Sequence, residues 1–162
     1  MLLAFPRIAV LSLCATAVAT LAAGCTGEPG RVLTLSGSLV GKEGDVIRRQ
    51  LERFRQTHPS QLRLCSVVKS ELIYGARKSH RVADNLRLLT TFFGPLQSLP
   101  FDDSCAAVAG AIRAELARSG QPIGPNDSLI AATAVNFKCT LVTHNTKEFD
   151  RVPELFLVDW ET

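Results

Sequence analysis

The fold is decided by one stretch of sequence, Leu62-Arg-Leu-Cys-Ser66-Val-Val-Lys-Ser-Glu71-Leu-Ile-Tyr-Gly75, and by the way its pattern continues. Its apolar beginning, 62–66, predicts a short buried strand, and 67–78 predicts a helix that carries Glu71. Strands and helices then alternate to the end of the chain, which is typical of an α/β fold with a mainly parallel sheet. The further strands are expected at 96–99, 140–143 and 156–158, and the further helices at 83–93, from Asp102 or Asp103 to Arg118, and from Pro125 to Phe137.

The charge is unevenly spread along the 162 residues. Residues 1–61 hold seven Lys or Arg against four Asp or Glu, whereas residues 62–162 hold eleven of each. The second part is therefore neutral and lacks the broad basic face that binds nucleic acid strongly without sequence preference. If it acts on RNA, a metal ion and local cations such as Lys69, Arg77 and Lys78 must provide the attraction, although those three also fit a solvated helix face.

The five cysteines form no C-x-x-C pair, and the chain has three histidines, so a structural zinc site is not expected. Cys65, Cys105 and Cys139 lie in apolar runs and are predicted to be buried, reduced thiols. This pattern is typical of a cytosolic domain.

The first part of the chain follows a different pattern. Residues 1–25 carry one charge, Arg7, before an apolar run, and Leu21-Ala-Ala-Gly-Cys25 resembles a bacterial lipoprotein cleavage site. Two alternative interpretations of this segment are a buried apolar helix and a mistranslated upstream sequence. Residues 21–59, with a strand expected at 32–40 and a helix at 43–56, resemble the mature start of sugar-type solute-binding lipoproteins. We therefore divide the chain into a signal-like segment (1–25), this second segment (26–61) and an α/β domain (62–162).

Three acids stand where an α/β sheet would bring them together. Glu71 lies on the helix after the first strand of the domain, Asp127 in the first turn of its helix, and Glu148 shortly after the strand at 140–143. Clustered carboxylates repel one another unless a cation neutralises them, and Mg²⁺ or Mn²⁺ prefers oxygen ligands. Each acid also has a structural explanation: Glu71 solvated, Asp127 a first-turn acid, and Glu148 paired with Arg151.

Three motifs resemble those of PIN-domain ribonucleases of the VapC toxin type. They are Ser66–Gly75, which contains Glu71, then Pro122-Ile-Gly-Pro-Asn-Asp127-Ser-Leu-Ile-Ala-Ala132, and Leu141-Val-Thr-His-Asn145-Thr-Lys-Glu148-Phe149. The resemblance implies a three-layer PIN fold over 62–162 and metal-dependent cleavage of RNA. It implies that Glu71, Asp127 and Glu148 hold Mg²⁺ or Mn²⁺, while Asn126, Thr143 and Asn145 orient ligands or water. It also implies a cognate antitoxin as partner and a homodimer.

The chain departs from this family at its first acidic motif. The family opens with a strand ending in Leu-Asp-Thr-Asn, about 35 residues before the helix Glu, and that Asp is the central metal ligand. The stretch at this distance here is Leu33-Thr-Leu-Ser36-Gly-Ser38, in which Ser36 carries no charge. We therefore expect a PIN domain whose first strand is lost or replaced, with three acids instead of four and weaker metal binding.

Three hypotheses follow. The chain is a VapC-like ribonuclease with impaired activity, an inactive PIN remnant that still binds an antitoxin, or a fragment of an exported lipoprotein in which the acids have no role. The signal-like segment predicts export, whereas the acidic motifs predict a cytoplasmic domain. We favour the cytoplasm, because three spaced motifs arise by chance less easily than a short hydrophobic start.

Overall fold

A computed structural model describes residues 9–11, 52–54 and 56–160. Its centre is a five-stranded sheet in the order β3-β2-β1-β4-β5, and every neighbouring pair is parallel. The strands are β1 (Ala9–Leu11), β2 (Leu62–Cys65), β3 (Gln97–Leu99), β4 (Thr140–Val142) and β5 (Phe156–Val158). Each of the four strands expected from 62 onward is present, within one residue of its predicted bounds.

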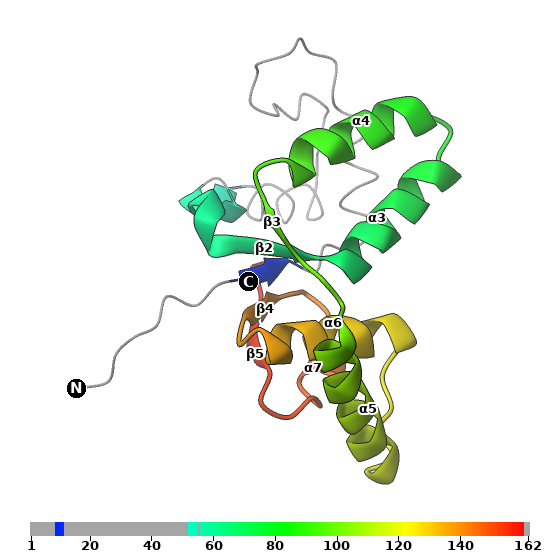
Figure 1. Ribbon diagram of the computed structural model, residues 1–162, viewed down its shortest axis with the longest axis vertical. Helices are drawn as coiled ribbons and strands as arrows, with labels where there is room; N and C mark the ends of the chain where they lie inside the picture. Colours follow the sequence, from blue (N-terminus) through cyan, green and yellow to red (C-terminus); the bar gives the residue numbers. More distant parts are fainter. Residues whose placement is uncertain (1–8, 12–51, 55, 161–162) are drawn as a thin grey trace, which may run out of the picture.

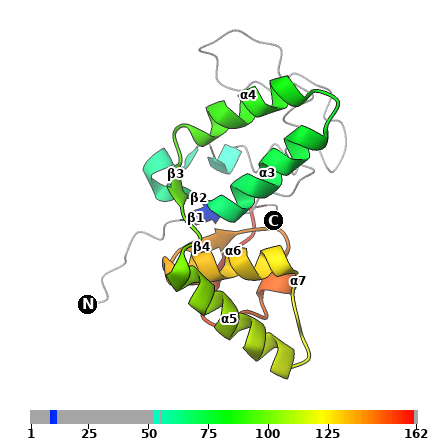
Figure 2. The ribbon, with the colours of Figure 1, turned by 45° about the vertical axis from the view of Figure 1, so that its right-hand side comes forward.

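Helices cover both sides of this sheet. They are α3 (Ser66–Lys78), α4 (Val82–Phe93), α5 (Asp103–Arg118), α6 (Pro125–Asn136) and the short α7 (Thr146–Phe149). The connection from β2 to β3 runs outward and that from β3 to β4 runs back across the sheet, so right-handed crossovers place their helices on opposite faces. Figures 1 and 2 show α3 and α4 on one side, and α5, α6 and α7 on the other. The predicted three-layer α/β fold is confirmed.

The central strand is the main correction to the sequence analysis. β1 pairs with β2 on one side and with β4 on the other, with Val10 opposite Arg63 and Leu11 opposite Val142. Ala9–Leu11, inside the apolar start of the chain, therefore fills the central place for which the spacing from Glu71 had indicated the stretch 33–38. That spacing indicated the wrong stretch, since β1 occupies the centre of the sheet.

Most of the N-terminal predictions lie outside the described residues. This holds for the strand at 32–40, for the segment resembling a solute-binding lipoprotein, and for all of the signal-like segment except β1. Of the helix expected at 43–56, residues 52–54 and 56 are helical, followed by a 3-10 turn at Pro59–Gln61. Within the described ranges, no helix combines the length and the apolar character needed to cross a membrane.

Local capping explains where the helices begin and end. Asp102 caps α5, since its Oδ1 accepts a hydrogen bond from the backbone N–H of Cys105 at 3.0 Å. Beyond α5, Gly120 adopts a left-handed φ of 69°, which ends the helix at little steric cost. Pro125 begins α6, where its missing N–H has no helical partner to lose.

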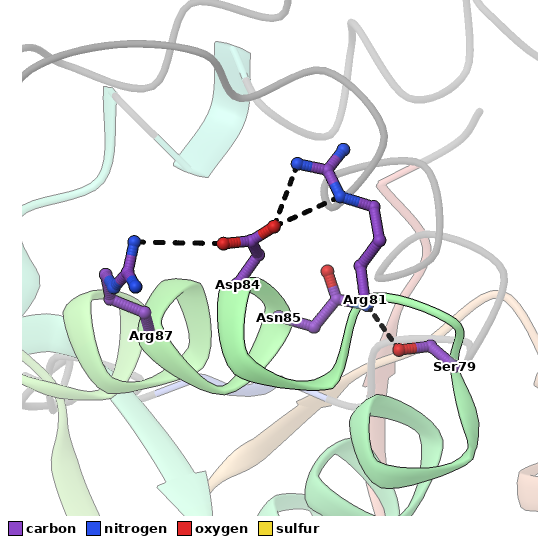
Figure 3. A network of polar contacts seen from close by, with 5 residues as sticks. All are labelled: Ser79, Arg81, Asp84, Asn85 and Arg87. Carbon is purple, nitrogen blue, oxygen red and sulfur yellow. Dashed lines mark hydrogen bonds and ion pairs between the residues drawn. The ribbon is translucent and has the colours of Figure 1, made fainter.

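The turn between α3 and α4 is held by polar contacts, drawn in Figure 3. The Asn85 side-chain amide donates to Ser79 Oγ at 2.8 Å, and the Ser79 hydroxyl donates to the carbonyl of Ala76 at 2.7 Å. On the solvent side, Asp84 forms ion pairs with Arg81 at 3.0 Å and Arg87 at 3.8 Å. These contacts fix the position of α4 relative to the end of α3.

The core lies between the sheet and the helices. Among its fully buried side chains are Leu62 and Leu64 of β2, Ile130 of α6, Leu141 of β4 and Phe149 of α7. Cys65, Cys105 and Cys139 are buried free thiols, as predicted, and burial raises the pKa of all three. They are therefore protonated at neutral pH and fill space as small apolar groups.

Candidate functional site

The strand order changes direction at one place in the sheet, between β1 and β4. From β1 the sheet is continued by β2 and β3 on one side and by β4 and β5 on the other. The order of the strands therefore reverses between β1 and β4, and open α/β sheets bind ligands beside the carboxyl ends of the strands at such a topological switch point. Glu71, Asp127 and Glu148 all lie on segments that border this point.

Glu71 is fixed by a contact between two helices. It lies in α3, which leaves the carboxyl end of β2, and its Oε1 accepts a hydrogen bond from the Asn126 side-chain amide at 2.9 Å. Asn126 is the second residue of α6 and is 55 positions away in the sequence. The bond therefore ties the first-turn residues of α6 to α3 and orients the Glu71 carboxylate.

The carboxyl of Asp127 has a raised pKa. Burial raises the pKa of its carboxyl above the usual value, and the neighbouring charges of Glu71 and Glu148 raise it further. The sequence therefore brings these three acids, from three separate segments, within electrostatic reach of one another. Gly124 lies directly against Asp127, because a Cβ at residue 124 would stand 2.7 Å from Asp127 Oδ2.

Glu148 is held by Arg151 on the same short segment. The Arg151 guanidinium lies 3.5 Å from Glu148 Oε2 and donates to the carbonyl of Pro122 at 3.3 Å. The predicted Glu148–Arg151 pair is thus present, and the contact with Pro122 joins α7 to the loop that leads into Asp127. Both charged side chains are about one-third exposed, at 34%, so the pair contributes more to position than to stability.

The turn after β4 is fixed by Thr143 and Asn145. Thr143 is buried, and its hydroxyl oxygen accepts a hydrogen bond from the backbone N–H of Asn145 at 3.1 Å. Asn145 in turn accepts, through its carbonyl, from the backbone N–H groups of Glu148 and Phe149. These two residues therefore shape the backbone that presents Glu148.

The three carboxylates do not close around a common point by themselves. In the parts of the chain that the structure describes, no three His, Cys, Asp or Glu side chains form a ready set of metal ligands. The charges of Glu71 and Glu148 raise the free energy of ionising Asp127. The donor chemistry is nevertheless that of a hard cation, being made only of carboxylate and amide oxygens.

Three features of this site were not predicted. Helix α7 is only four residues long, too short for helical periodicity to be seen. Asn145 followed by Glu148 has the spacing of a helix N-cap and its third residue, and this was the available signal. Arg151 and Pro122 are 29 positions apart in the sequence, so no local pattern indicates their contact. Gly124 and Asp127 are close in sequence, and their approach follows from the turn that begins α6.

The raised pKa of Asp127 has a consequence for stability without metal. An acid whose pKa is higher in the folded than in the unfolded state loses stability as pH rises through that window, because the folded state binds more protons there. We expect Asp127→Asn to raise the metal-free unfolding temperature at pH 7 by about 1–3 °C, from roughly 0.5 kcal/mol after solvent screening. The difference from the parent should shrink near pH 4, as measured by thermal unfolding; a difference that is absent at pH 7 would contradict the coupling.

Comparison with known proteins gives consistent matches. A family model described as "PIN domain" matches residues 41–155. The chain is 41% identical over 109 residues to a tRNA(fMet)-specific endonuclease VapC of Salmonella typhimurium, covering 67% of this chain and 82% of that protein. It is 36% identical over 122 residues to a ribonuclease VapC2 of Rickettsia felis, covering 75% and 90%. The crystal structure of VapBC2 from Rickettsia felis bound to a promoter DNA fragment matches with a TM-score of 0.68 and 30% identity, over 94% of this chain and 98% of that one.

Proposed function

Because the chain belongs to the PIN-domain family, and within it to the VapC-type proteins, we propose that it is a metal-dependent endoribonuclease, the toxin of a type II toxin–antitoxin pair. The observation that carries the proposal is the gathering of Glu71, Asp127 and Glu148 at the switch point of the sheet, with the pKa of Asp127 raised by burial and by the other two acids. Relatives named as ribonucleases support the same reaction class.

Glu71, Asp127 and Glu148 would hold one Mg²⁺ or Mn²⁺. Such an ion relieves the carboxylate repulsion, which favours binding even though the acids stand apart without it. When bound, it would supply Lewis-acid stabilisation of charge on a phosphodiester and lower the pKa of a water molecule.

The other residues of the site position these acids. Asn126 orients Glu71 through its 2.9 Å hydrogen bond, and Arg151 holds Glu148 against the loop at Pro122. Thr143 and Asn145 fix the turn that carries Glu148. Partners of this kind typically change metal affinity or activity about 10- to 100-fold when removed.

The activity is reduced because the central acid is missing. The strand β1 ends at Leu11 beside β4, and the first 27 residues of the chain contain no Asp or Glu. Three acids bind a metal less tightly than four and leave it less firmly oriented. The same observation favours a second candidate function, that of a catalytically inactive PIN domain that still binds an antitoxin.

The partner that we propose is a cognate antitoxin protein, as in the VapBC complexes to which this chain is similar. The protein would act in the cytoplasm as a homodimer, where RNA and antitoxin are found. Fractionation of the full chain in a Gram-negative host tests the location. Recovery in the membrane fraction, with a mass that shows cleavage before Cys25, would overturn it.

Metal binding is the first test of this proposal. We expect Mn²⁺ at tenfold excess over its Kd to stabilise the protein by about 1.4 kcal/mol and to raise its unfolding temperature by about 3–6 °C. The measurement is thermal unfolding of the full chain with and without metal. No shift at millimolar metal would contradict the proposed site.

Gly124→Ala and Asp127→Ala provide the matched controls. An added Cβ at residue 124 meets only the end of the Asp127 side chain, so the fold accommodates it while the carboxylate must move. Both variants are expected to remain folded and to lose most of the shift with metal. A variant at the exposed Gly110, to which a Cβ adds no contact, is expected to keep the full shift.

A further inference from the structure

The exposed face of α3 beside Glu71 carries an aromatic side chain in solvent. Tyr74 is 63% exposed, one turn beyond Glu71 on the same helix. Glu71, Tyr74, Gly75 and Lys78 have the spacing that places side chains on one helix face, and Lys78 lies about 10 Å along the axis from Glu71. The Lys78 ammonium stands 5.5 Å from the centre of the Tyr74 ring. An exposed aromatic ring with a cation beside it therefore lies next to the candidate site.

The cations at the end of α3 differ from those of the following turn in whether an acid neutralises them. Arg81 and Arg87 share the carboxylate of Asp84, as Figure 3 shows. Arg77 and Lys78 make no ion pair within the described part of the chain. Cations at a helix C-terminus do stabilise the helix dipole, but that effect accounts for neither the exposed ring of Tyr74 nor its position beside Glu71.

Gly75 leaves open space on the same face. A Cβ built at this residue would have no atom within 4 Å. Glycine in the middle of a helix lowers stability by roughly 0.5–1 kcal/mol relative to alanine. The packing of the described residues therefore gives no reason for glycine here, whereas close approach of a flat ligand to the helix backbone does.

We propose that the end of α3, with Tyr74, Gly75 and Lys78 on the face of Glu71 and Arg77 on the adjoining side, binds single-stranded RNA next to the cleaved phosphate. A base stacks on the ring of Tyr74 over the open backbone at Gly75, and flanking phosphates contact Arg77 and Lys78. Stacking on aromatic side chains combined with local cations is how proteins hold single strands without reading their sequence. The inference rests on the proposed ribonuclease function and supplies the local attraction that a neutral domain otherwise lacks.

RNA binding is measured separately from cleavage, so that the two proposals fail independently. The full chain with Asp127→Asn, which is expected not to cleave, is titrated against a fluorescent single-stranded RNA of about twelve nucleotides. We expect Tyr74→Ala to weaken binding about 5- to 30-fold, whereas Tyr74→Phe stays within about twofold, because the ring provides the stacking. Since Tyr74 is largely in solvent, both variants are expected to unfold near the parent temperature.

Two matched pairs test the cations and the open backbone. Lys78→Gln should lower the slope of log affinity against log salt by about 0.7, as expected for one lost phosphate contact with a single strand. Arg113→Gln, an exposed cation on α5, should leave the slope unchanged. Gly75→Ala and Gly110→Ala should both stabilise the free protein, but only Gly75→Ala should weaken RNA binding.

The outcomes separate cleanly. Unchanged RNA affinity in Tyr74→Ala and Lys78→Gln overturns the RNA face, as does a loss of antitoxin binding in the same variants without an effect on RNA. A chain that binds no RNA overturns both proposals. Binding that depends on Tyr74, in a protein that never cleaves RNA, supports the RNA face and contradicts the ribonuclease proposal.

Discussion

Replacement of Ser12 by aspartate is expected to raise metal-dependent RNA cleavage by about 100-fold over the parent chain. Leu11 is the last residue of β1 and pairs with Val142, the residue before Thr143, and Ser12 follows it in the sequence. A carboxylate added after Leu11 would bring a fourth acid to the carboxyl end of the central strand. Removing an outer partner of a metal ligand typically costs 10- to 100-fold, so restoring a ligand itself is expected at the upper end of that range.

Ser36→Asp is the matched control for this result. It makes the same substitution at the position suggested by spacing from Glu71, and it is expected to leave the rate unchanged because β1 already fills the central place. Adding Asp127→Asn to Ser12→Asp should remove the gain. The measurement is initial cleavage of a labelled RNA at fixed Mn²⁺. Robust cleavage by the parent, or activation by Ser36→Asp alone, would show that the missing acid is supplied in another way.

The strands and helices around the three acidic motifs could be predicted from the sequence because their signals are local. Around Glu71, Asp127 and Glu148, strand, turn and helix signals lie within a dozen residues, and the alternation fixes which ends of the strands face one another. The predicted bounds of the helices agree with the observed ones for the same reason, since a capping side chain such as that of Asp102 bonds to a backbone group only three residues away.

The central strand could not be predicted because its pairing is not local. Ala9–Leu11 lies inside a long apolar run that has no period of its own, and such a run fits a buried strand as well as a helix or a signal segment. What selects these three residues is hydrogen bonding to β2 and β4, more than 50 positions away. The contact of Arg151 with Pro122 was missed for a similar reason, since these residues are 29 positions apart and meet only in the folded chain.

Phe149→Ala is expected to destabilise the protein by about 3–5 kcal/mol, the largest loss of stability that we predict for a residue of the site. Phe149 is 1% exposed and is the only buried residue of α7, whose four residues cannot form a stable helix alone. Its burial therefore holds both the helix and Glu148, which precedes it.

Chemical denaturation of Phe149→Ala and Tyr74→Ala measures this difference between two aromatic side chains. Tyr74 is 63% exposed and its removal creates no cavity, so that variant is expected to lose less than about 1 kcal/mol. The folded fraction of Phe149→Ala should also lose its response to Mn²⁺, because Glu148 no longer has a fixed position. If Phe149→Ala instead kept its stability and its response to metal, α7 would be held by contacts other than this side chain, and the geometry assigned to Glu148 would be wrong.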